Sequence, residues 1–537
     1  MRRLAKIRSP EDLRGLKERD LRSLAEEIRE KIVETISSNG GHLASNLGVI
    51  ELTIALHTVF ESPKDAIVWD VGHQCYTHKL LTGRVDAFSK IRRKGGISGF
   101  PKRSESPHDI FETGHSSTAL SSALGLLEAR STLGIEGKVV AVVGDGALTA
   151  GLAYEALANV VQLGLPLIVV LNDNKMSISR NVGALSRYLS RLTAGMRYQS
   201  FRRKFDSMAG NIPRIGPFIL DFVVRGKRAV KAIFFKNNFF SDLGFEYIGP
   251  IDGHNLVMLT RALGQAKRME HPVVVHVLTT KGKGNDKAEE NPESFHGVAP
   301  ACADAPSPNQ SFTKSFGASL LELAKADPRL VAISAAMVKG TGLETMAKVL
   351  PGRVYDVGIA EQHAVTFAAG LATGGLKPVV AIYSTFAQRA LDQIIHDVVL
   401  PRLGVVFALD RAGAVGEDGE THQGLYDIPL LRGLPGLSVL APSCEAEMGA
   451  FLRAALDRGE PVVLRYPKAE MECSEDFASL PLIWGRGVFA RRRQGSRLLV
   501  CALGPLVHAA ARASDTLARS GLFADVYSLR FASPLDE

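Results

Sequence analysis

Lys138-Val-Val-Ala-Val-Val-Gly144-Asp145-Gly146 opens the stretch of sequence that decides the fold. Apolar residues at helical spacing follow over 148–163, and 166–171 is a second run of aliphatic and β-branched residues. Strand, helix and strand in this order form a βαβ unit, whose two strands are parallel neighbours. The second strand runs into Asn172-Asp173-Asn174. Both polar clusters are therefore expected at the carboxyl edge of one sheet, where open α/β sheets bind ligands.

The alternation of strands and helices restarts after residues 299–310, a stretch with three prolines and no periodicity that we predict to be a linker. Beyond it we predict strands over 354–357, 378–383 and 405–409 and helices over 361–373 and 386–400. A last alternation, starting near Trp484, has strands over 498–503 and 524–529 around a helix over 506–520. We expect an α/β protein with domains at 1–298 and 311–475 and a short or truncated third α/β domain at 484–537.

Composition excludes several classes of protein. The chain has 537 residues, of which 46% are hydrophobic and 22% charged, a balance that excludes a disordered chain, a collagen and a small disulfide scaffold. No apolar run approaches the roughly 20 residues that cross a bilayer, so no membrane span is expected. The N-terminus has charges but no apolar core of a signal peptide, and five scattered cysteines indicate reduced thiols. We therefore expect a cytoplasmic protein.

The positive charge is concentrated in one segment. Residues 187–236 contain 12 Lys or Arg and 2 Asp or Glu, an excess larger than the net charge of +8 of the whole chain. We interpret 187–240 as a mobile basic surface segment. The alternative is an anionic partner, either a nucleic acid or a membrane surface. No nucleic-acid-binding motif accompanies the segment, so no nucleic acid is expected as a partner.

The first polar cluster suits a magnesium ion. Asn174 follows Asp145 by 29 residues, and the backbone carbonyl of Met176 lies close by in sequence. Mg²⁺ prefers oxygen ligands and usually shares phosphate oxygens with its ligand. Glycines beside Asp145 allow a phosphate to approach the backbone closely. The alternative is an ordinary Gly-Asp-Gly turn with an unrelated asparagine.

Histidines in glycine- and serine-rich strings point to a second kind of chemistry. The strings contain His42, His73, His115 and His422. Such loops hold donors and proton carriers around a ligand, although each histidine taken alone is more often a structural one. No two histidines have the helical spacing of a zinc site.

Acidic and basic residues follow the strands of the second predicted domain. Glu361 stands where a strand gives way to a helix, and the alternative is a favourable acidic residue in a first helical turn. The glycine-rich loop from Asp410-Arg411 to His422 suits an anionic, oxygenated substrate. Arg389 and Arg465 are further candidates for a phosphate or carboxylate, the alternative being ordinary surface arginines.

These strings resemble a known family. Gly144-Asp145-Gly146 with Asn172-Asp173-Asn174 resembles the thiamine diphosphate motif, and Asp356-Val-Gly-Ile-Ala-Glu361-Gln-His363 resembles the activating-glutamate segment of transketolase-like enzymes. Finer strings resemble the 1-deoxy-D-xylulose-5-phosphate synthases: Gly-Gly-His42-Leu-Ala-Ser45, Trp-Asp-Val-Gly-His73-Gln, Gly-His115-Ser-Ser-Thr, Tyr247-Ile-Gly-Pro-Ile-Asp-Gly-His254, Tyr383-Ser-Thr-Phe386-Ala-Gln-Arg389 and Asp410-Arg411-Ala-Gly.

The resemblance implies a transketolase-like fold with two parallel-sheet domains that bind thiamine diphosphate and Mg²⁺. It implies a transferase that condenses pyruvate with D-glyceraldehyde 3-phosphate to 1-deoxy-D-xylulose 5-phosphate and carbon dioxide. This reaction opens the methylerythritol phosphate route of isoprene biosynthesis and also feeds thiamine and pyridoxal biosynthesis. A homodimer is implied as well.

The resemblance also implies a role for each matching residue. Magnesium ligands would be Asp145, Asn174 and the Met176 carbonyl. Cofactor contacts would come from His73, Gly114, His115, Ser116, Gly146, Ala147, Asn174 and Phe386, with Glu361 on the aminopyrimidine ring. The phosphate end of the acceptor would meet Tyr383, Arg411 and Arg465, with Ser45 nearby. The reacting carbons would face His42, Arg389, Asp418 and His422, and one of the two histidines would protonate the new alkoxide.

Two departures from the family keep other functions open. Asn285 stands where the family often has a tyrosine beside the cofactor, and the third domain is shorter than usual. The alternatives are a transketolase, which exchanges two-carbon units between sugar phosphates, and a truncated, non-catalytic thiamine diphosphate-binding protein.

Overall fold

The computed structural model describes residues 3–176, 188–189, 238–300, 310–416, 419–472 and 480–536. The chain divides into two compact units, residues 1–303 and 304–537. Most of the predicted basic segment 187–240 and of the predicted linker 299–310 lies outside the described residues, so both interpretations stay predictions, as do the three predicted domain boundaries.

A five-stranded parallel sheet forms the middle of the first unit, in the order β1-β2-β3-β5-β4. Its strands are β1 (Ala66–Trp69), β2 (Val139–Gly144), β3 (Ile168–Asp173), β4 (Glu246–Asp252) and β5 (Val273–Leu278). The predicted βαβ unit is confirmed, because β2 and β3 pair in parallel with α6 (Gly151–Leu163) between them. Gly144 lies opposite Asn172, which brings the two polar clusters to one edge.

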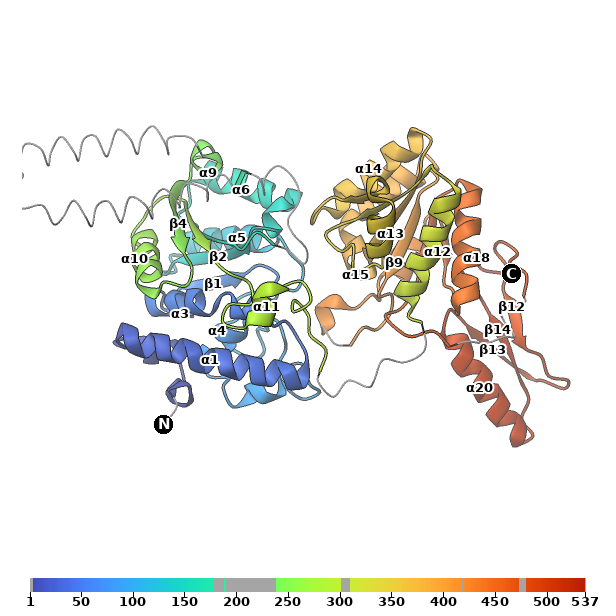
Figure 1. The fold of residues 1–537 in the computed structure, drawn as a ribbon, viewed down its shortest axis with the longest axis horizontal. Coiled ribbons are helices and arrows are strands. Elements are labelled where there is room, and N and C mark those ends of the chain that lie inside the picture. The colour runs from blue at the N-terminus through green and yellow to red at the C-terminus, as the bar shows by residue number, and fades with distance from the viewer. Residues whose placement is uncertain are drawn as a thin grey trace, which may run out of the picture. The chain divides into compact units, whose positions relative to one another are not determined.

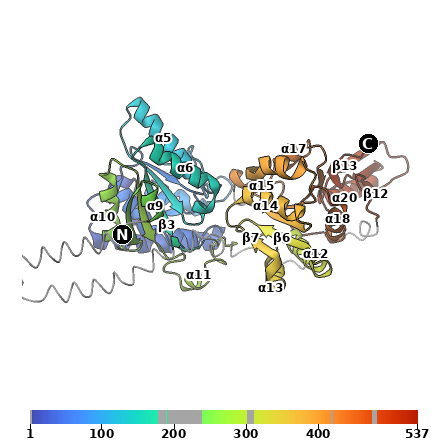
Figure 2. The same cartoon turned by 90° about the horizontal axis from the view of Figure 1, so that it is seen from above.

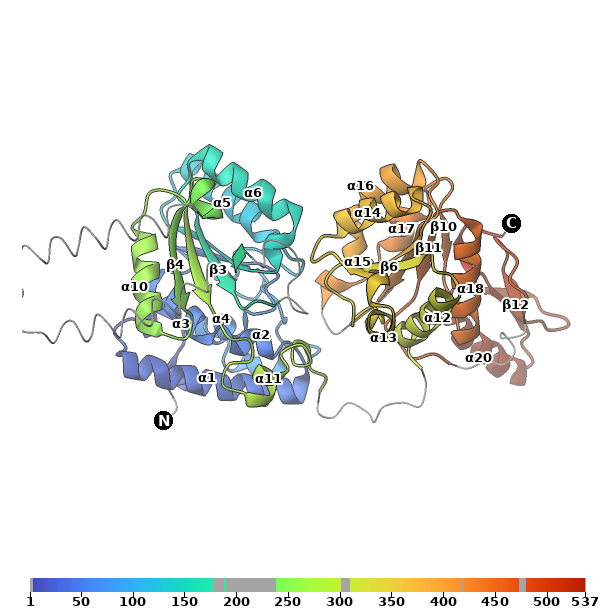
Figure 3. The same ribbon diagram turned by 45° about the horizontal axis from the view of Figure 1, so that its top comes forward.

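Both faces of this sheet are buried, as expected for a parallel sheet. Val140 and Val142 pack into one core with helices α1 (Glu18–Asn39), α3 (Ile50–Val59) and α10 (Leu256–Lys267). Val139, Ala141 and Val143 face the other way, toward α5 (Ala119–Leu133) and α6. Figures 1 and 3 show these two helical layers on opposite sides of the strands. The short helices of the unit are α2 (Ala44–Leu47), α4 (Tyr76–Leu81), α9 (Phe239–Asp242) and α11 (Asp286–Glu290).

The second unit contains a seven-stranded sheet in the order β15-β10-β11-β9-β8-β6-β7. All neighbours are parallel except β15 and β10. The strands are β6 (Leu330–Ser334), β7 (Val354–Asp356), β8 (Lys377–Tyr383), β9 (Val406–Asp410), β10 (Ser438–Leu440), β11 (Val462–Arg465) and β15 (Phe531–Ser533). The strands predicted at 354–357, 378–383 and 405–409 are thereby confirmed.

Helices cover both faces of this second sheet. One face packs against α12 (Phe312–Ala326) and α18 (Glu445–Arg458). Figure 2 shows α12 and α13 (Glu344–Val349) on the opposite side of the strands from α14 (Glu361–Thr373), α15 (Ser384–Ala387) and α17 (Asp427–Leu431). The predicted helix over 361–373 is confirmed with the same bounds.

The single helix predicted over 386–400 is wrong. The chain there forms α15, a 3₁₀ turn (Gln388–Ala390), α16 (Leu391–Gln393) and a π-helical turn (Ile394–Val399). Leu400 N accordingly donates to Ile395 O, five residues back. Periodicity could not reveal these breaks, since apolar residues at 394, 398 and 399 are still buried by the changed hydrogen-bond pattern.

The C-terminal part of the second unit carries a small sheet with the order β12-β14-β13. Its elements are β12 (Val488–Arg491), β13 (Leu498–Ala502), α20 (Leu506–Arg519) and β14 (Ala524–Ser528), so the predicted strand-helix-strand pattern is confirmed. Sequence reasoning missed β12 and β15. The antiparallel pairing of β15 with β10 joins this part to the large sheet.

A buried arginine next to β15 fastens this junction. Arg530 is 1% exposed, and its Nε donates to Glu447 Oε1 of α18 at 2.7 Å while Nη1 donates to Pro481 O at 2.7 Å. The charges of Arg530 and Glu447 are both removed from water, so each needs the other as its neutralising partner. In the part of the chain that the structure describes, no helix has the length and apolarity needed to cross a membrane.

Replacing Arg530 by methionine should destabilise the second unit by about 3–5 kcal/mol, because it leaves the buried Glu447 carboxylate without its partner. The loss is measured by urea unfolding, followed by the fluorescence of Trp484, which packs on Phe531 with ring centroids 5.3 Å apart. Trp69 is replaced by phenylalanine in every protein compared, so that the signal comes from Trp484. Lys348→Ala, which breaks an exposed pair with Glu344, is the control and should change stability by less than about 1 kcal/mol. Equal effects of the two substitutions would contradict this account.

Candidate functional site

The predicted magnesium ligands of the first unit gather where β2 and β3 end. Asp145 is 3% exposed, and its backbone N donates to Asn172 O at 3.1 Å. Asn174 Oδ1 accepts from Met176 N at 3.0 Å, so the three predicted ligands belong to one compact loop pair. Burial raises the pKa of Asp145 well above its ordinary value, and the neighbouring Asp173 carboxyl raises it further.

Two adjacent buried carboxyl groups need a shared proton or a cation. A carboxylate, an amide oxygen and a backbone carbonyl fit Mg²⁺, which binds through one or two carboxylates and completes its shell with phosphate oxygens and water. Among the described residues no group of three or more His, Cys, Asp or Glu side chains is placed to hold a metal. The donors present therefore fit a metal that arrives with a phosphate ligand rather than a protein-only cage.

A buried relay behind this edge was missed by sequence reasoning. His276 Nε2 lies 2.9 Å from Asp173 Oδ2, and His276 Nδ1 lies 2.7 Å from the hydroxyl of Tyr247. His276 is fully buried. The two contacts of His276 fix the position of the Asp173 carboxyl group. Because Asp173 neighbours Asp145, they also fix the surroundings of the Asp145 carboxyl group. The one signal in the sequence was a histidine that interrupts the otherwise continuous apolar run of β5.

Three histidines form a second group in the first unit. The ring of His42 lies 5.3 Å from that of His73 and 5.4 Å from that of His296, measured between centroids. Ser45 Oγ lies 3.3 Å from His296 Nδ1. Burial lowers the pKa of His296 well below its ordinary value, and Lys281 adds to the shift, so this ring stays neutral. His296 was missed, although its Ser294-Phe-His-Gly297 string has the same character as those that were noticed.

Buried side chains fix the loops that carry these residues. Asn46 Nδ2 donates to the carbonyls of His42 and His73 at 2.7 and 2.8 Å. Asp70 accepts from the backbone of Ser117 and Ala119, and Ser117 Oγ donates to Ala147 O at 2.7 Å. The loop with Gly114, His115 and Ser116 is thereby tied to the loop with Gly146 and Ala147.

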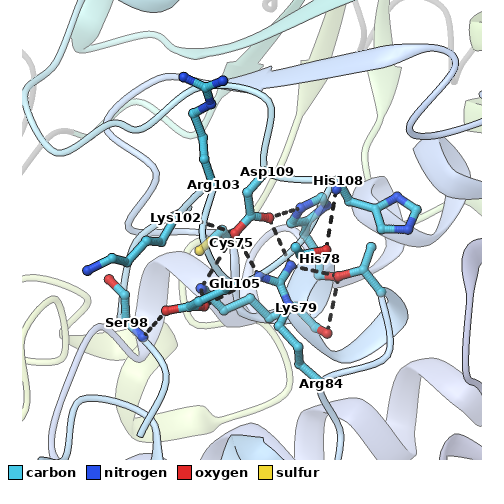
Figure 4. Close-up of polar contacts among 12 residues, drawn as sticks. Cys75, His78, Lys79, Arg84, Ser98, Lys102, Arg103, Glu105, His108 and Asp109 are labelled. Atoms are coloured by element: carbon cyan, nitrogen blue, oxygen red, sulfur yellow. Dashed lines mark hydrogen bonds and ion pairs between the residues drawn. The ribbon is translucent and has the colours of Figure 1, made fainter. Parts of the chain in front are cut away.

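A buried ion cluster stands beside these loops (Figure 4). Asp109 receives both Nη atoms of Arg84 at 2.6 and 2.8 Å and His78 Nε2 at 2.8 Å. Lys79 Nζ donates to Glu105 Oε2 at 2.6 Å. We call Lys79, Arg84, Glu105, Asp109 and His78 the Asp109 cluster. Glu105 and Asp109 also accept from the backbone N of Ser98 and Lys102, so the cluster pins segment 98–109 to α4.

Segment 98–109 packs closely against Gly72, the residue before the predicted cofactor contact His73. Gly72 has φ +84°, and a Cβ on it would lie 2.3 Å from Thr113 Oγ1 and 2.4 Å from Pro101 Cδ. Only glycine fits this close approach. The loop of His73 is therefore set by the packing of the segment that the Asp109 cluster holds.

In the second unit, Glu361 is the first residue of α14 and is 2% exposed. Arg389 Nη1 lies 3.7 Å from its Oε2, and that oxygen is buried without a hydrogen-bond partner among the described residues. Burial raises the pKa of Glu361, although Arg389 opposes the shift. A buried carboxyl oxygen that lacks a donor fits a ring nitrogen of a bound cofactor.

Aromatic residues surround the predicted stacking residue Phe386. Its ring is stacked with that of Tyr383, with centroids 5.8 Å apart, and meets the ring of His422 edge-on at 5.6 Å. His422 Nδ1 lies 3.0 Å from Thr421 Oγ1. Asp418, the remaining predicted residue of this loop, lies outside the described residues.

The predicted phosphate-binding residues stand at the ends of neighbouring strands. Tyr383 ends β8 opposite Asp410 of β9, and Arg465 ends β11 opposite Leu409 of β9. The guanidinium of Arg411 lies 3.7 Å from the centre of the Tyr383 ring, and its Nη1 donates to Gly340 O at 3.0 Å. The side chains of Arg389 and Arg465 are each 15% exposed, so the alternative of ordinary surface arginines is wrong for both.

The structure thus brings together Asn174 and Met176 beside Asp145, His42 with His73, and Tyr383 with Phe386, Arg411 and His422, while no hydrogen bond, ion pair or ring contact joins Arg465 to this last group among the described residues. Asn285, where the family often has tyrosine, caps helix α11, since its Oδ1 accepts from Ala288 N at 3.1 Å. The functional roles of all these residues stay predictions.

Comparison with known proteins identifies two regions. Residues 4–279 match the family model described as 1-deoxy-D-xylulose-5-phosphate synthase, and residues 309–473 match the transketolase pyrimidine binding domain. A 1-deoxy-D-xylulose-5-phosphate synthase of Treponema pallidum is 52% identical over 99% of this chain and 85% of its own length. The 1-deoxy-D-xylulose-5-phosphate synthase of Desulforudis audaxviator is 51% identical over 98% of this chain and 83% of its own length.

The stability of the first unit should fall as the pH drops from 7.5 to 5. Burial lowers the pKa of His57 and of His78, which lie 2.9 Å apart, below their ordinary values. The unfolded chain takes up protons below a pH of about 6.5 while the folded state resists them, so stability is full above that pH and is lost below it, by up to about 1.4 kcal/mol per pH unit for each histidine.

His57→Gln tests this prediction, because the glutamine amide can donate to His78 from the position of His57 Nε2 and does not titrate. Urea unfolding at the two pH values is followed by the fluorescence of Trp69, which lies 5.6 Å from the His78 ring, with Trp484 replaced by phenylalanine. The variant should lose less stability than its parent between pH 7.5 and 5. An unchanged pH dependence would show that His57 is not held neutral.

Proposed function

The chain belongs to the 1-deoxy-D-xylulose-5-phosphate synthase family, and from this premise we propose which of its residues perform each part of the family's reaction. The enzyme is a transketolase-type transferase that depends on thiamine diphosphate. It condenses pyruvate with D-glyceraldehyde 3-phosphate to give 1-deoxy-D-xylulose 5-phosphate and carbon dioxide, which leads into isoprenoid synthesis.

The observation that carries the residue assignment is the buried Glu361 carboxyl, whose Oε2 has no donor among the described residues. Thiamine diphosphate, when bound, supplies the nucleophilic carbon and the electron sink that decarboxylation of pyruvate requires. Glu361 is proposed to hold a proton between its Oε2 and the aminopyrimidine ring nitrogen. Its raised pKa suits this sharing, because a buried carboxyl that keeps its proton can donate it in a hydrogen bond to the ring nitrogen.

The diphosphate end is assigned to the first unit. Asp145, Asn174 and the Met176 carbonyl are proposed to hold Mg²⁺. Gly146 and Ala147 are buried in the loop after β2 and are proposed to face the diphosphate. His73, Gly114, His115 and Ser116 are proposed as further cofactor contacts, and Phe386 is proposed to stack on the aminopyrimidine.

Proton transfer at the reacting carbons is assigned to histidines. His42 stands in the group with His73 and His296, and His422 stands against Phe386. Either ring can give a proton to the alkoxide that forms when the aldehyde is attacked. Arg389 and Asp418 are proposed to face the reacting carbons and to orient the carboxylate and hydroxyl groups of the substrates, while Ser45 is proposed to lie near the phosphate end of the acceptor.

The acceptor's phosphate is assigned to Tyr383, Arg411 and Arg465. Two arginines and a phenol at the ends of neighbouring strands offer charge-assisted hydrogen bonds to a phosphate dianion. Binding energy at this remote end aligns the aldehyde for reaction.

A homodimer, a cytoplasmic location and supply of thiamine and pyridoxal biosynthesis complete the proposal. Light scattering after size-exclusion chromatography tests the dimer, and a mass near that of one chain, 57.8 kDa, would contradict it.

Glu361→Gln should lower kcat by about 10²–10⁴-fold, because the amide cannot take part in the proton transfer that the carboxyl performs. The measurement is release of labelled carbon dioxide from pyruvate, with thiamine diphosphate and Mg²⁺, in the presence and absence of D-glyceraldehyde 3-phosphate. The wild-type chain should release carbon dioxide and form the pentulose phosphate.

The control is Glu344→Gln, on the exposed face of α13, which should keep wild-type activity. Activity with a ketose phosphate donor in place of pyruvate would support a transketolase instead. Cofactor binding without turnover of either donor would indicate a non-catalytic binding protein. Glu361→Gln with wild-type kcat would refute the role given to Glu361.

A further inference from the structure

Arg465 is held by a carboxylate that no part of the proposed machinery uses. Its Nε donates to Asp427 Oδ2 at 2.7 Å. The Asp427 side chain is 2% exposed and the Arg465 side chain 15% exposed. The pair is therefore largely shielded from water. Away from water, the attraction between two well-placed opposite charges is much stronger than on a surface.

Asp427 is itself fixed. It is the first residue of α17, and its Oδ1 accepts from the backbone N of Ile428 at 2.8 Å. One carboxylate oxygen is thus bound to the helix start and the other to Arg465. A long arginine side chain loses rotamer entropy when it is ordered, and here the ordering takes place on folding and not on substrate binding.

The hydrogen bond also sets which edge of the guanidinium is turned to a ligand. With Nε directed at Asp427, the Nη1 and Nη2 groups form the end that is left to face an oxyanion, and two parallel N–H groups suit a phosphate. Arg411, which follows the neighbouring strand β9, is oriented in another way, by the Tyr383 ring and the Gly340 carbonyl. Arg411 and Arg465 are thus held in position by different contacts.

We propose that Asp427 is a positioning residue that presents Arg465 to the phosphate of the acceptor and so makes the enzyme prefer phosphorylated aldehydes. This inference rests on the proposed function, in particular on the assignment of Arg465 to the acceptor phosphate. Asp427 does not touch the substrate; it acts through Arg465. Its effect is confined to acceptors that carry a phosphate.

The test compares two acceptors, D-glyceraldehyde 3-phosphate and unphosphorylated D-glyceraldehyde, each with saturating pyruvate. Asp427→Ala should lower kcat/KM for the phosphorylated acceptor by about 10–100-fold, mainly through KM, since misplacing a binding group by about 1 Å can cost 10²-fold. For the unphosphorylated acceptor the change should be below about twofold. Asp427→Asn keeps the size and an acceptor oxygen and should show a smaller loss with the same selectivity.

Arg465→Met is the reference, and it should show the same acceptor selectivity. In the double variant of Asp427→Ala and Arg465→Met, the loss should be no larger than in Arg465→Met alone, because Asp427 acts through that arginine. Affinity for thiamine diphosphate, measured by titration calorimetry, should stay at the wild-type value in every variant, which excludes a general loss of structure.

The possible results distinguish a failure of the role proposed for Asp427 from a failure of the proposed function. If Arg465→Met is selective but both Asp427 variants lose activity equally with the two acceptors, or lose none, the inference alone is overturned. If Arg465→Met shows no selectivity, the phosphate assignment and the inference fail together. If the wild-type chain forms no pentulose with either acceptor, the proposed function fails, and the inference with it.

Discussion

Parallel pairing is the constraint on which the candidate site depends. Because parallel strands share one carboxyl edge, the register that puts Gly144 opposite Asn172 places the Asp145 loop beside Asn174. The same rule in the second sheet sets Tyr383 opposite Asp410 and Arg465 opposite Leu409. Residues far apart in sequence become neighbours without any long loop. A slip of one residue in either register would turn these side chains to other faces of the sheet.

Pairs of buried opposite charges are the second organising feature. The Asp109 cluster, the Arg530–Glu447 pair and the Asp427–Arg465 pair each hold a loop or strand against an element distant in sequence. Removing one partner leaves an uncompensated charge in a dry interior, which makes each pair sensitive to substitution. Such pairs define one arrangement of the elements that they join, among them the end of β11 that carries Arg465. Rigidity at these points is what pre-positions the site.

The sequence predicted what local patterns encode. The βαβ unit and the helix from Glu361 to Thr373 follow from periodicity, and the strings around His42, Glu361 and Arg411 identified the family. It could not predict the broken helix after Phe386, because the buried residues Ile394 and Val398 are four apart, a spacing that an unbroken α-helix also has. Nor could it predict that Asp427 meets Arg465, 38 residues away, since that contact depends on which strands are neighbours. His276 was missed for the same reason, because its partners are distant in sequence, whereas the string around His296 did carry a local signal.

Calorimetric titration of thiamine diphosphate into the purified chain tests the central claim most directly. The account predicts binding of one cofactor per chain that requires Mg²⁺, and a loss of at least about tenfold in affinity when Asp145 is replaced by asparagine, because the carboxylate at the edge of the first sheet is proposed to hold the metal. Binding that is independent of Mg²⁺, or of the Asp145 carboxylate, would contradict the claim that the parallel register of β2 and β3 builds the cofactor site.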